Sequence, residues 1–558
     1  MQDDMRSGHR RRWGAMIGAS ALVSGLVVVA SPGMAVADGH GHTHGPGADH
    51  GTAAVVGTTW GDRTADRAAL GRHGEHAESL DAGSLFTVTH AVGARAVWER
   101  KDRAGRAITG QGVTVAVLDS GVEEVPGLAG KTVQGPDLSL ESGGDGLADD
   151  TYGHGTHMAG IIAARDDVPV DRRTGAPRST DPGAQLGVAP DAQVLALKLA
   201  ATDGSTDVSQ VIAALDWVAQ HQDDNGMDVR VVNLSFGTDS VQPYQIDPLA
   251  AAAEHAWRSG LVVVVSGGND GEDAGALSNP AIDPYVIAVG ASDPNGAATG
   301  WSAPSVADFS SRGTDERHVD LVAPGASIVS LRAPDSFVDT EHPEGRVAGD
   351  DTGRLFRGSG TSQAAAVVSG AAALVLQANP ALTPDGVKHA LVSTARPLAG
   401  EAAVDAGAGQ VDISAAVRAA EKVKAHGAPV VQTWPQASGL GSLDAARGGS
   451  RLVDPGTGDV LVGEIDVFGA PWDPTAWAQA SSSGTAWDGG EWMRARWSGD
   501  AWTSDGWARA RWSDASWDRA RWSRARWSDA SWDRARWSRA RWSDASWERA
   551  RWSSVPWS

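Results

Sequence analysis

The sequence predicts an α/β domain: a doubly wound, mostly parallel sheet with helices on both faces. Short apolar, β-branched runs recur along the middle of the chain, and helical patterns alternate with them. A run without polar alternation is typical of a strand buried on both faces, as in a parallel sheet. Polar residues stand where these runs end, at the sheet edge where doubly wound domains bind ligands.

The elements follow from local patterns in chain order. In the predicted helix at 208–221, apolar residues repeat every three or four positions. The predicted helix at 367–376 is Ala-rich and apolar on all sides, which indicates a buried core helix. Strands are predicted at residues 113–118, 229–234, 261–265 and 286–289, and helices at residues 158–164, 208–221, 367–376 and 411–420.

Ser362 stands at the start of the core helix, after two glycines that let another backbone approach. Free N–H groups and the positive end of the helix dipole gather at such a start, so an anion beside the Ser362 hydroxyl is stabilised. A serine that attacks a carbonyl needs this arrangement. Taken alone, the same residues also fit an ordinary Gly-Ser turn that caps a core helix.

Two further polar residues complete a candidate catalytic set. Asp119 ends the first strand, and His154 lies between two glycines ahead of the helix at 158–164. A hydroxyl is a poor nucleophile until a neighbouring base takes its proton, and histidine does this near neutral pH. A carboxylate on the far ring nitrogen fixes the tautomer and stabilises the imidazolium. Asp119, His154 and Ser362 together therefore indicate nucleophilic hydrolysis.

Six motifs make residues 88–420 resemble one family, the subtilisin-like serine peptidases or subtilases. The chain order Asp, His, Ser is also the order found in subtilisin. The motifs are VAVLDSGV at 115–122, GHGTHMAG at 153–160, NLSFG at 233–237, GNDG at 268–271, LVAPG at 321–325 and GTSQAA at 360–365.

The resemblance implies a role for each matched residue. Asp119, His154 and Ser362 would be the catalytic triad, and Asn269 with the Ser362 backbone N–H would bind the oxyanion. Gly267 and Gly268 would leave room for the side chain before the scissile bond. The substrate cleft would be walled by Ser235, Phe236, Gly237, Ser266, Gly267 and Gly268.

Two residues depart from the family pattern. Gln363 follows the nucleophile where Met is common, and Ala366 stands where Pro is common. Neither position belongs to the triad, so activity is still expected.

Three of these residues also fit other interpretations. Asp119 in Asp-Ser-Gly also fits an aspartic protease, but the second such motif, at 351–353, is not preceded by a strand. Asn269 also fits a turn, since Asn-Asp-Gly is good turn chemistry. His157 is expected to be a packed helix residue rather than a base.

Composition limits the partners. The chain has 558 residues, a net charge of −22 and no Cys, which excludes disulfides and thiol chemistry and argues against a nucleic-acid partner. The chemistry itself requires no cofactor. The resemblance allows structural calcium, but no acidic cluster has a spacing that names ligands. Asp145, Asp149 and Asp150 are expected only to solvate a loop.

The N-terminus predicts secretion. Residues 1–37 read as a signal peptide, with three arginines at 10–12, an apolar run and a small-residue cleavage site. A membrane anchor is the alternative, but the apolar run is short and broken by Gly and Ser. Residues 38–87 are Gly/His-rich and predicted to be a disordered segment or pro-segment, in which four histidines at 40–50 are an unspecific metal-binding pattern.

The C-terminus predicts a linker over 421–486 and a repeat tail over 487–558. Trp recurs every five residues from Trp487 to Trp557, and residues 511–525 are repeated without change at 526–540. A period of five fits neither a helix nor a strand, so an extended or weakly ordered tail is expected. Its indoles and guanidinium groups suit cell-wall polysaccharide or another anionic polymer. An inert extension without a ligand is the alternative.

Together these observations predict a secreted, extracellular serine endopeptidase that acts on proteins or peptides. The competing function is a cell-surface or cell-wall binding protein whose repeat tail is the main functional element. The intact set of Asp119, His154, Ser362 and Asn269 favours the peptidase.

Overall fold

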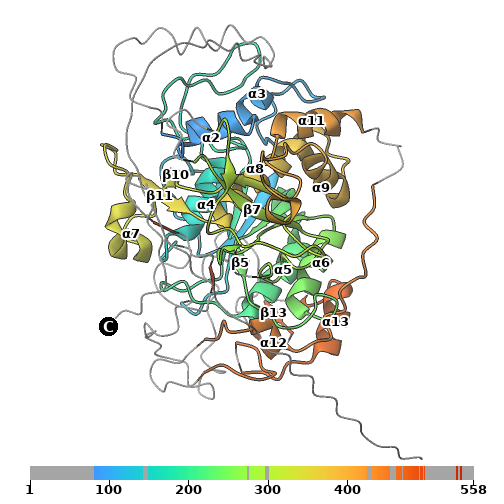
Figure 1. Cartoon of the computed structure of the whole chain (residues 1–558). Coiled ribbons are helices and arrows are strands. Elements are labelled where there is room, and N and C mark those ends of the chain that lie inside the picture. Colours follow the sequence, from blue (N-terminus) through green and yellow to red (C-terminus); the bar gives the residue numbers. More distant parts are fainter. Residues whose placement is uncertain are drawn as a thin grey trace, which may run out of the picture. The chain divides into compact units, whose positions relative to one another are not determined.

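The structure is a computed structural model of the whole chain (Figure 1). The signal peptide predicted at 1–37, nearly all of the segment at 38–87 and most of the repeat tail lie outside the residues it describes. The described residues are 81–141, 149–272, 275–295, 301–423, 430–452, 460–467, 469–488, 490–493, 495–496, 536–537 and 541–542.

The predicted doubly wound, mostly parallel sheet is confirmed. Its strand order is β2-β3-β1-β4-β6-β7-β8, with β9 also paired to β7, and only the β7–β8 pair is antiparallel. The strands are β1 (Thr114–Asp119), β2 (Thr132–Asp137), β3 (Gln193–Lys198), β4 (Val229–Leu234), β6 (Val262–Ser266), β7 (Ile287–Asp293), β8 (Ser305–Val306) and β9 (Leu321–Pro324).

Strand β1 is the point at which the sheet reverses its direction of growth. The chain first adds β2 and β3 on one side of β1, and then adds β4, β6 and β7 on the other. Such a switch point opens a crevice beyond the carboxyl ends of the strands. Asp119, the last residue of β1, stands at this crevice.

Helices cover both faces of the sheet (Figure 1). The core helix α8 packs on β4, β6, β7 and β9 and also against α4, while α5 and α6 pack against each other over β1 and β6. Within the described residues, α8 alone is long and apolar enough to span a membrane, but all of it is buried in the domain. The main helices are α4 (His154–Ala163), α5 (Val208–His221), α6 (Pro248–Arg258), α8 (Thr361–Ala378), α9 (Pro384–Val392) and α11 (Ile413–Lys422).

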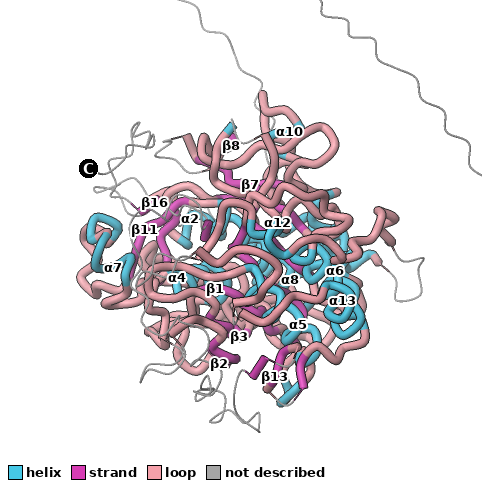
Figure 2. Tube along the Cα trace, turned by 90° about the horizontal axis from the view of Figure 1, so that it is seen from below, coloured by secondary structure: helices cyan, strands magenta, loops and turns pink. Residues whose placement is uncertain are grey.

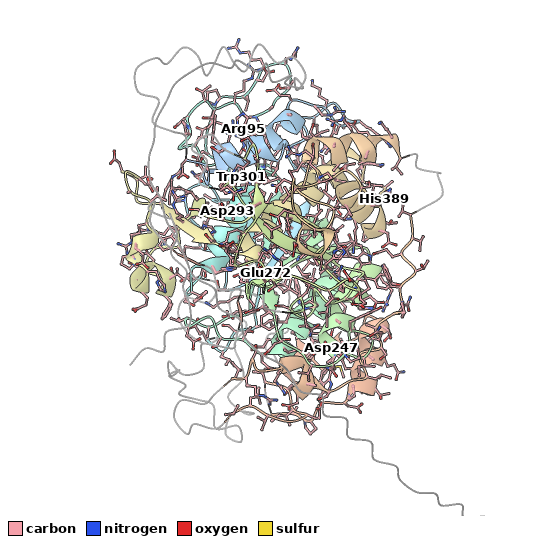
Figure 3. All side chains as sticks on the ribbon, in the orientation of Figure 1. Arg95, Asp247, Glu272, Asp293, Trp301 and His389 are labelled. Carbon is pink, nitrogen blue, oxygen red and sulfur yellow. The ribbon has the colours of Figure 1, made fainter. Side chains whose placement is uncertain are left out.

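Side-chain caps fix where these helices start. Asp247, labelled in Figure 3, precedes α6 and accepts hydrogen bonds from the backbone N–H groups of Leu249 and Ala250 at 2.8 and 3.1 Å. Asn279 Nδ2 also donates to Asp247 at 3.0 Å, which ties the helix start to a neighbouring loop. Such a cap contributes about 1 kcal/mol to helix stability.

Smaller elements surround the sheet. The helix α2 begins three residues before the predicted domain boundary at 88, with Ser84 as its cap. Strands β10 and β11 form an antiparallel pair that leads into α8. These elements are α2 (Leu85–Ala91), α3 (Ala94–Trp98), β5 (Phe236–Gly237), β10 (Ile328–Leu331), α7 (Phe337–Glu341), β11 (Leu355–Ser359) and α10 (Ala403–Ala406), with 3-10 turns at Asp224–Gly226 and Pro343–Gly345.

The predicted linker is wrong for the described residues between 430 and 486, because they pack on the domain. They contribute α12 (Leu443–Arg447) and α13 (Pro474–Ser482), which contact α5 and α6. The first repeats follow as a three-stranded meander of β12 (Trp487–Asp488), β13 (Glu491–Trp492) and β14 (Ala495–Arg496). Their tryptophans are buried together with two earlier ones, Trp472 and Trp477.

A buried carboxylate on α5 receives these tryptophans. Asp216 accepts hydrogen bonds from the indole N–H groups of Trp477 and Trp492, both at 2.9 Å, and from the Ser481 hydroxyl at 2.6 Å. Burial raises the pKa of Asp216 above its usual value despite these bonds.

The five-residue spacing of the tryptophans corresponds to one step of a β-hairpin in the first repeats. Trp487 lies opposite Trp492 across a two-residue turn, so one repeat makes one hairpin step.

A buried ion pair fastens the same segment to α5. Arg447 Nε lies 2.6 Å from Asp207 Oδ2, and neither side chain is exposed. Burial alone would raise the pKa of Asp207, but the Arg447 guanidinium outweighs it and holds the pKa below its usual value. A depressed carboxyl pKa stabilises the fold at neutral pH. This contribution is lost as the pH falls through the lowered value.

We expect Arg447→Met to lower the free energy of unfolding by about 3–5 kcal/mol, because it leaves Asp207 charged and buried without its partner. Urea unfolding at pH 7 measures this. Arg178→Met is the matched control, since Arg178 is 58% exposed in its pair with Asp171 and should change stability by at most about 1 kcal/mol. Equal losses of stability in the two variants would contradict the conclusion that the Arg447–Asp207 ion pair fastens this segment to α5.

Candidate active site

Asp119 and His154 are in direct contact at the crevice beside β1. His154 is the first residue of α4, and its Nδ1 lies 2.8 and 2.9 Å from the two carboxylate oxygens of Asp119. Burial lowers the pKa of His154, but the neighbouring Asp119 carboxylate outweighs this and raises the pKa above its ordinary value. With Nδ1–H donated to Asp119, Nε2 is the ring nitrogen that can accept a proton.

Ser120 and Asp150 hold this pair in place. The Ser120 backbone N–H donates to Asp119 Oδ1 at 2.8 Å, and the Ser120 hydroxyl donates to Asp150 Oδ1 at 2.7 Å. Asp150 also accepts the backbone N–H groups of Gly153 and Thr156, both at 2.7 Å, at the start of α4. Asp150 therefore orients the helix that presents His154.

The prediction that Asp150 only solvates a loop is wrong. Its side chain is 3% exposed, and burial raises its pKa above the usual value. The signal was available in the sequence, because an Asp just before a helix is a frequent cap. Asp149 is exposed, and Asp145 lies outside the described residues.

His157 joins α4 to the strand that leads to the nucleophile. Its Nε2 lies 3.2 Å from the carbonyl oxygen of Phe356 on β11, and the Ser330 hydroxyl donates to the His157 carbonyl at 2.8 Å. Burial lowers the pKa of His157 to about 3, so its ring is neutral at physiological pH. As the sequence predicts, His157 is a packed helix residue.

Ser362 is the second residue of α8, which begins six residues before the apolar run at 367–376 that predicts this helix. Backbone N–H groups in a first helical turn have no partner within the helix. Asn269 lies beside them, and its Oδ1 accepts the Thr361 backbone N–H at 2.8 Å and the Thr361 hydroxyl at 3.0 Å. This orientation turns Asn269 Nδ2 the other way, where it is buried and has no acceptor among the described residues.

The predicted cleft residues lie at the ends of two central strands. Ser235 follows β4 and leads into β5, while Ser266 ends β6. Asn233 of β4 donates to the Ser235 hydroxyl at 3.1 Å and accepts from Ser369 of α8 at 2.9 Å. Asn233 thus connects Ser235, the residue before β5, to α8, the helix that carries Ser362.

The role of Gly267 and Gly268 in leaving space for a substrate side chain stays a prediction. A Cβ on Gly267 would lie 3.0 Å from Val319, and one on Gly268 would lie 2.6 and 2.7 Å from the hydroxyls of Ser278 and Ser311. Atoms of this chain therefore lie where a Cβ at either glycine would be. Gly268 has a φ of +113°, which also favours glycine.

Gln363 is fully buried next to the nucleophile. A Cβ on Gly360 would lie 2.7 Å from Gln363 Oε1 and 3.5 Å from Asn269 Nδ2, so both amides border the same turn. Neither polar atom of the Gln363 amide has a partner among the described residues. Ala366 is buried within α8.

We expect peroxide to leave the activity of the protein largely unchanged and to inactivate a Gln363→Met variant. Met next to the nucleophile is oxidised to a polar sulfoxide that crowds the turn, whereas Gln is not oxidised in this way. Residual hydrolysis of a small peptide after peroxide treatment measures the effect. Met158 is completely buried, and Met158→Leu in both backgrounds controls for its oxidation. Equal sensitivity of the two proteins would contradict the prediction.

The described residues contain no group of three or more His, Asp or Glu side chains placed to hold a metal ion. The histidines at 40–50 lie outside the described residues. Structural calcium accordingly stays a prediction from the resemblance.

Comparison with known proteins places this geometry in a family. The model of the Subtilase family matches residues 110–411. Serine protease AprX of Bacillus subtilis (strain 168) is 37% identical over 313 residues, which is 55% of this chain and 65% of AprX. Subtilisin Savinase of Lederbergia lenta is 33% identical over 318 residues, which is 56% of this chain and 93% of Savinase.

Among solved structures, the crystal structure of MycP1 with the N-terminal propeptide removed is 28% identical, with a TM-score of 0.43, and the match covers 59% of this chain and 94% of that one. The family model spans more than half of the chain, and Savinase is matched over nearly its whole length. The chain therefore belongs to the subtilase family of serine proteases.

Proposed function

We propose that this protein is a secreted serine endopeptidase that uses Asp119, His154 and Ser362 as its triad. The observation that carries the proposal is the contact of His154 Nδ1 with Asp119, at 2.8 and 2.9 Å. His154 belongs to α4, which packs against α8, the helix that carries Ser362. Family membership supports the reaction class. The predicted signal peptide at 1–37 supports secretion.

In the first half of the reaction, His154 Nε2 takes the Ser362 hydroxyl proton while Ser362 Oγ attacks the substrate carbonyl carbon. The carbonyl oxygen becomes negatively charged and accepts hydrogen bonds from Asn269 Nδ2 and the Ser362 backbone N–H. His154 then gives its proton to the leaving amine, the C–N bond breaks, and an acyl group stays on Ser362.

In the second half, water replaces the amine. His154 takes a proton from the water molecule, the hydroxide attacks the acyl carbon, and the proton returns to Ser362 as the carboxylic acid product leaves. Asp119 stabilises the imidazolium in both halves. The raised pKa of His154 agrees with this, because it reflects a protonated ring held next to a carboxylate.

The substrate class we propose is extended protein or peptide chain. Edge strands such as β5 bind peptides through backbone hydrogen bonds, which accept many sequences. Ser235, Phe236 and Gly237 would form one wall, and Ser266, Gly267 and Gly268 the other.

Hydrolysis of casein by the purified full-length chain tests the proposal. Mass spectrometry should find new N-termini within casein, and these should be missing when a Ser362→Ala variant replaces the wild type. Casein fragments at the same rate with both proteins would show that Ser362 is not the nucleophile.

Binding of cell-wall polysaccharide or another anionic polymer by residues 487–558 stays a separate proposal. Trp487 and Trp492 are buried against the domain, so these two indoles are not available to stack on sugars. Any such binding would involve the repeats beyond 496. Co-sedimentation of the full chain with purified walls across a salt series tests this, because salt screens the Arg contacts.

A further inference from the structure

The buried amide of Gln363 has no part in the reaction of Asp119, His154 and Ser362. Gln363 directly follows Ser362 in the first turn of α8, the helix that lies in the interior of the domain (Figure 2). Its side chain has no exposed surface, and neither Nε2 nor Oε1 has a hydrogen-bond partner among the described residues. Burial of a donor and an acceptor without partners costs free energy, and some groups left in this state are catalytic.

This amide lies beside the two groups that would bind the oxyanion. A Cβ on Gly360 would lie 3.5 Å from Asn269 Nδ2 and 3.7 Å from the Ser362 backbone nitrogen. The same point lies 2.7 Å from Oε1 of Gln363. Because Gly360 has no Cβ, its side chain does not fill the space between these three groups. The separations are compatible with one carbonyl oxygen that accepts hydrogen bonds of about 2.9 Å from all three.

The amides of Asn269 and Gln363 differ in how they are held. Thr361 donates to Asn269 Oδ1 from its backbone N–H at 2.8 Å and from its hydroxyl at 3.0 Å, which fixes the orientation of that amide. No hydrogen bond within the described part of the chain fixes the amide of Gln363. Rotation about its last side-chain bond exchanges Nε2 with Oε1, and this torsion has two broad minima. The Nε2–H group can therefore turn toward an oxygen on which negative charge develops.

The chemistry of the amide distinguishes Gln363 from a residue that only fills space. Its Nε2–H is a hydrogen-bond donor, whereas Met, a side chain of similar length, has no donor. A donor that faces developing charge is most effective in a buried site from which water is excluded. A neutral amide also does not titrate, so its contribution does not depend on pH.

We propose that Gln363 is a third donor of the oxyanion hole, whose Nε2–H binds the substrate carbonyl oxygen as that oxygen becomes negatively charged. The proposal rests on the proposed function, because it names a further catalytic residue of the same reaction. The hydrogen bond is absent in the free protein and strongest in the transition state. Its loss therefore lowers kcat and leaves KM nearly unchanged.

The test compares variants of the full chain. Gln363→Met removes the donor and keeps the length of the side chain. We expect kcat for a small peptide to fall by about 30-fold, because a hydrogen bond to a charged oxygen is lost, while the acidic limb of the pH profile stays in place. Gln363→Leu also lacks a donor and should show a similar loss, because the loss depends on the donor and not on the shape of the side chain.

Gln377 provides the matched control. It lies in the same helix, is 3% exposed, and accepts the backbone N–H groups of Thr109 and Gly110 at 2.8 and 2.7 Å. It stands about 20 Å along the helix from Gln363. Gln377→Met should therefore lower stability and leave kcat nearly unchanged.

Two inhibitors separate a catalytic role from a structural one. A peptide aldehyde forms a tetrahedral adduct with Ser362 that carries an oxyanion, so Gln363→Met should weaken its binding by about the same 30-fold. A peptide in which a methylene group replaces the reacting carbonyl has no such oxygen, and its affinity should be the same for wild type and variant.

Each outcome is decisive. Unchanged kcat and unchanged affinity for the aldehyde in Gln363→Met would overturn the third donor and leave the peptidase function standing. Equal weakening of both inhibitors would show that Gln363 only shapes the cleft, which also overturns the proposal. A folded wild-type protein that neither hydrolyses peptides nor reacts with a fluorophosphonate probe would overturn the peptidase function, and the third donor with it.

Discussion

Replacement of Ser362 by Ala is expected to lower kcat for peptide hydrolysis by about 10⁶-fold, a magnitude known from subtilisin, which belongs to the same family. The variant lacks the oxygen that forms the acyl intermediate, so only binding and the oxyanion hole remain. The loss should appear in kcat measured at saturating substrate.

A matched substitution in the same helix controls for folding. Ser369 is also buried in α8, and its hydroxyl donates to Asn233 at 2.9 Å. Ser369→Ala should cost about 1 kcal/mol of stability and leave kcat nearly unchanged. A Ser362→Ala protein with a kcat close to that of Ser369→Ala would contradict the assignment of the nucleophile.

Replacement of Asp119 by Asn is expected to lower kcat by about 10⁴-fold, because the amide no longer selects the His154 tautomer or stabilises its protonated form. The pH dependence gives a second readout. His154 must be neutral to act as a base, and Asp119 raises its pKa. Wild-type kcat/KM should therefore fall as the pH drops through a value above the ordinary histidine pKa of about 6.5.

In Asp119→Asn this fall of kcat/KM, the acidic limb of the pH profile, should move to lower pH, since the neighbouring negative charge is gone. Asp171→Asn, at a carboxylate paired with exposed Arg178, should leave both kcat and the limb in place. An acidic limb at the same pH in Asp119→Asn and wild type would show that Asp119 does not control the titrating base.

Local patterns predicted the sheet and its central helices well. The helix at 208–221 and the strand at 229–234 have the predicted bounds. In both segments the pattern of apolar residues along the chain matches the side chains that are buried. The predicted start of α4 was four residues late. His154 and Gly155 are poor helix signals in themselves, and α4 is fixed at this end by Asp150, whose contact with Thr156 depends on the fold.

The parts that the sequence did not predict depend on contacts between distant segments. Asp216 looks like one polar residue on an apolar helix until Trp477 and Trp492 reach it from more than 250 positions away. The packed glycines at 267 and 268 likewise depend on Val319, Ser278 and Ser311. The five-residue spacing of the tryptophans matches neither a helix nor a strand. In the first repeats it is the distance along the chain between residues paired across a hairpin, as for Trp487 and Trp492.

Peptide mapping of the protein labelled by a fluorophosphonate probe tests the central claim most directly. The probe bonds covalently to an activated serine and not to an ordinary one. The account predicts one modified residue, Ser362, and loss of labelling when His154 is replaced by Ala. Modification of another serine, or labelling that persists without His154, would contradict the triad of Asp119, His154 and Ser362.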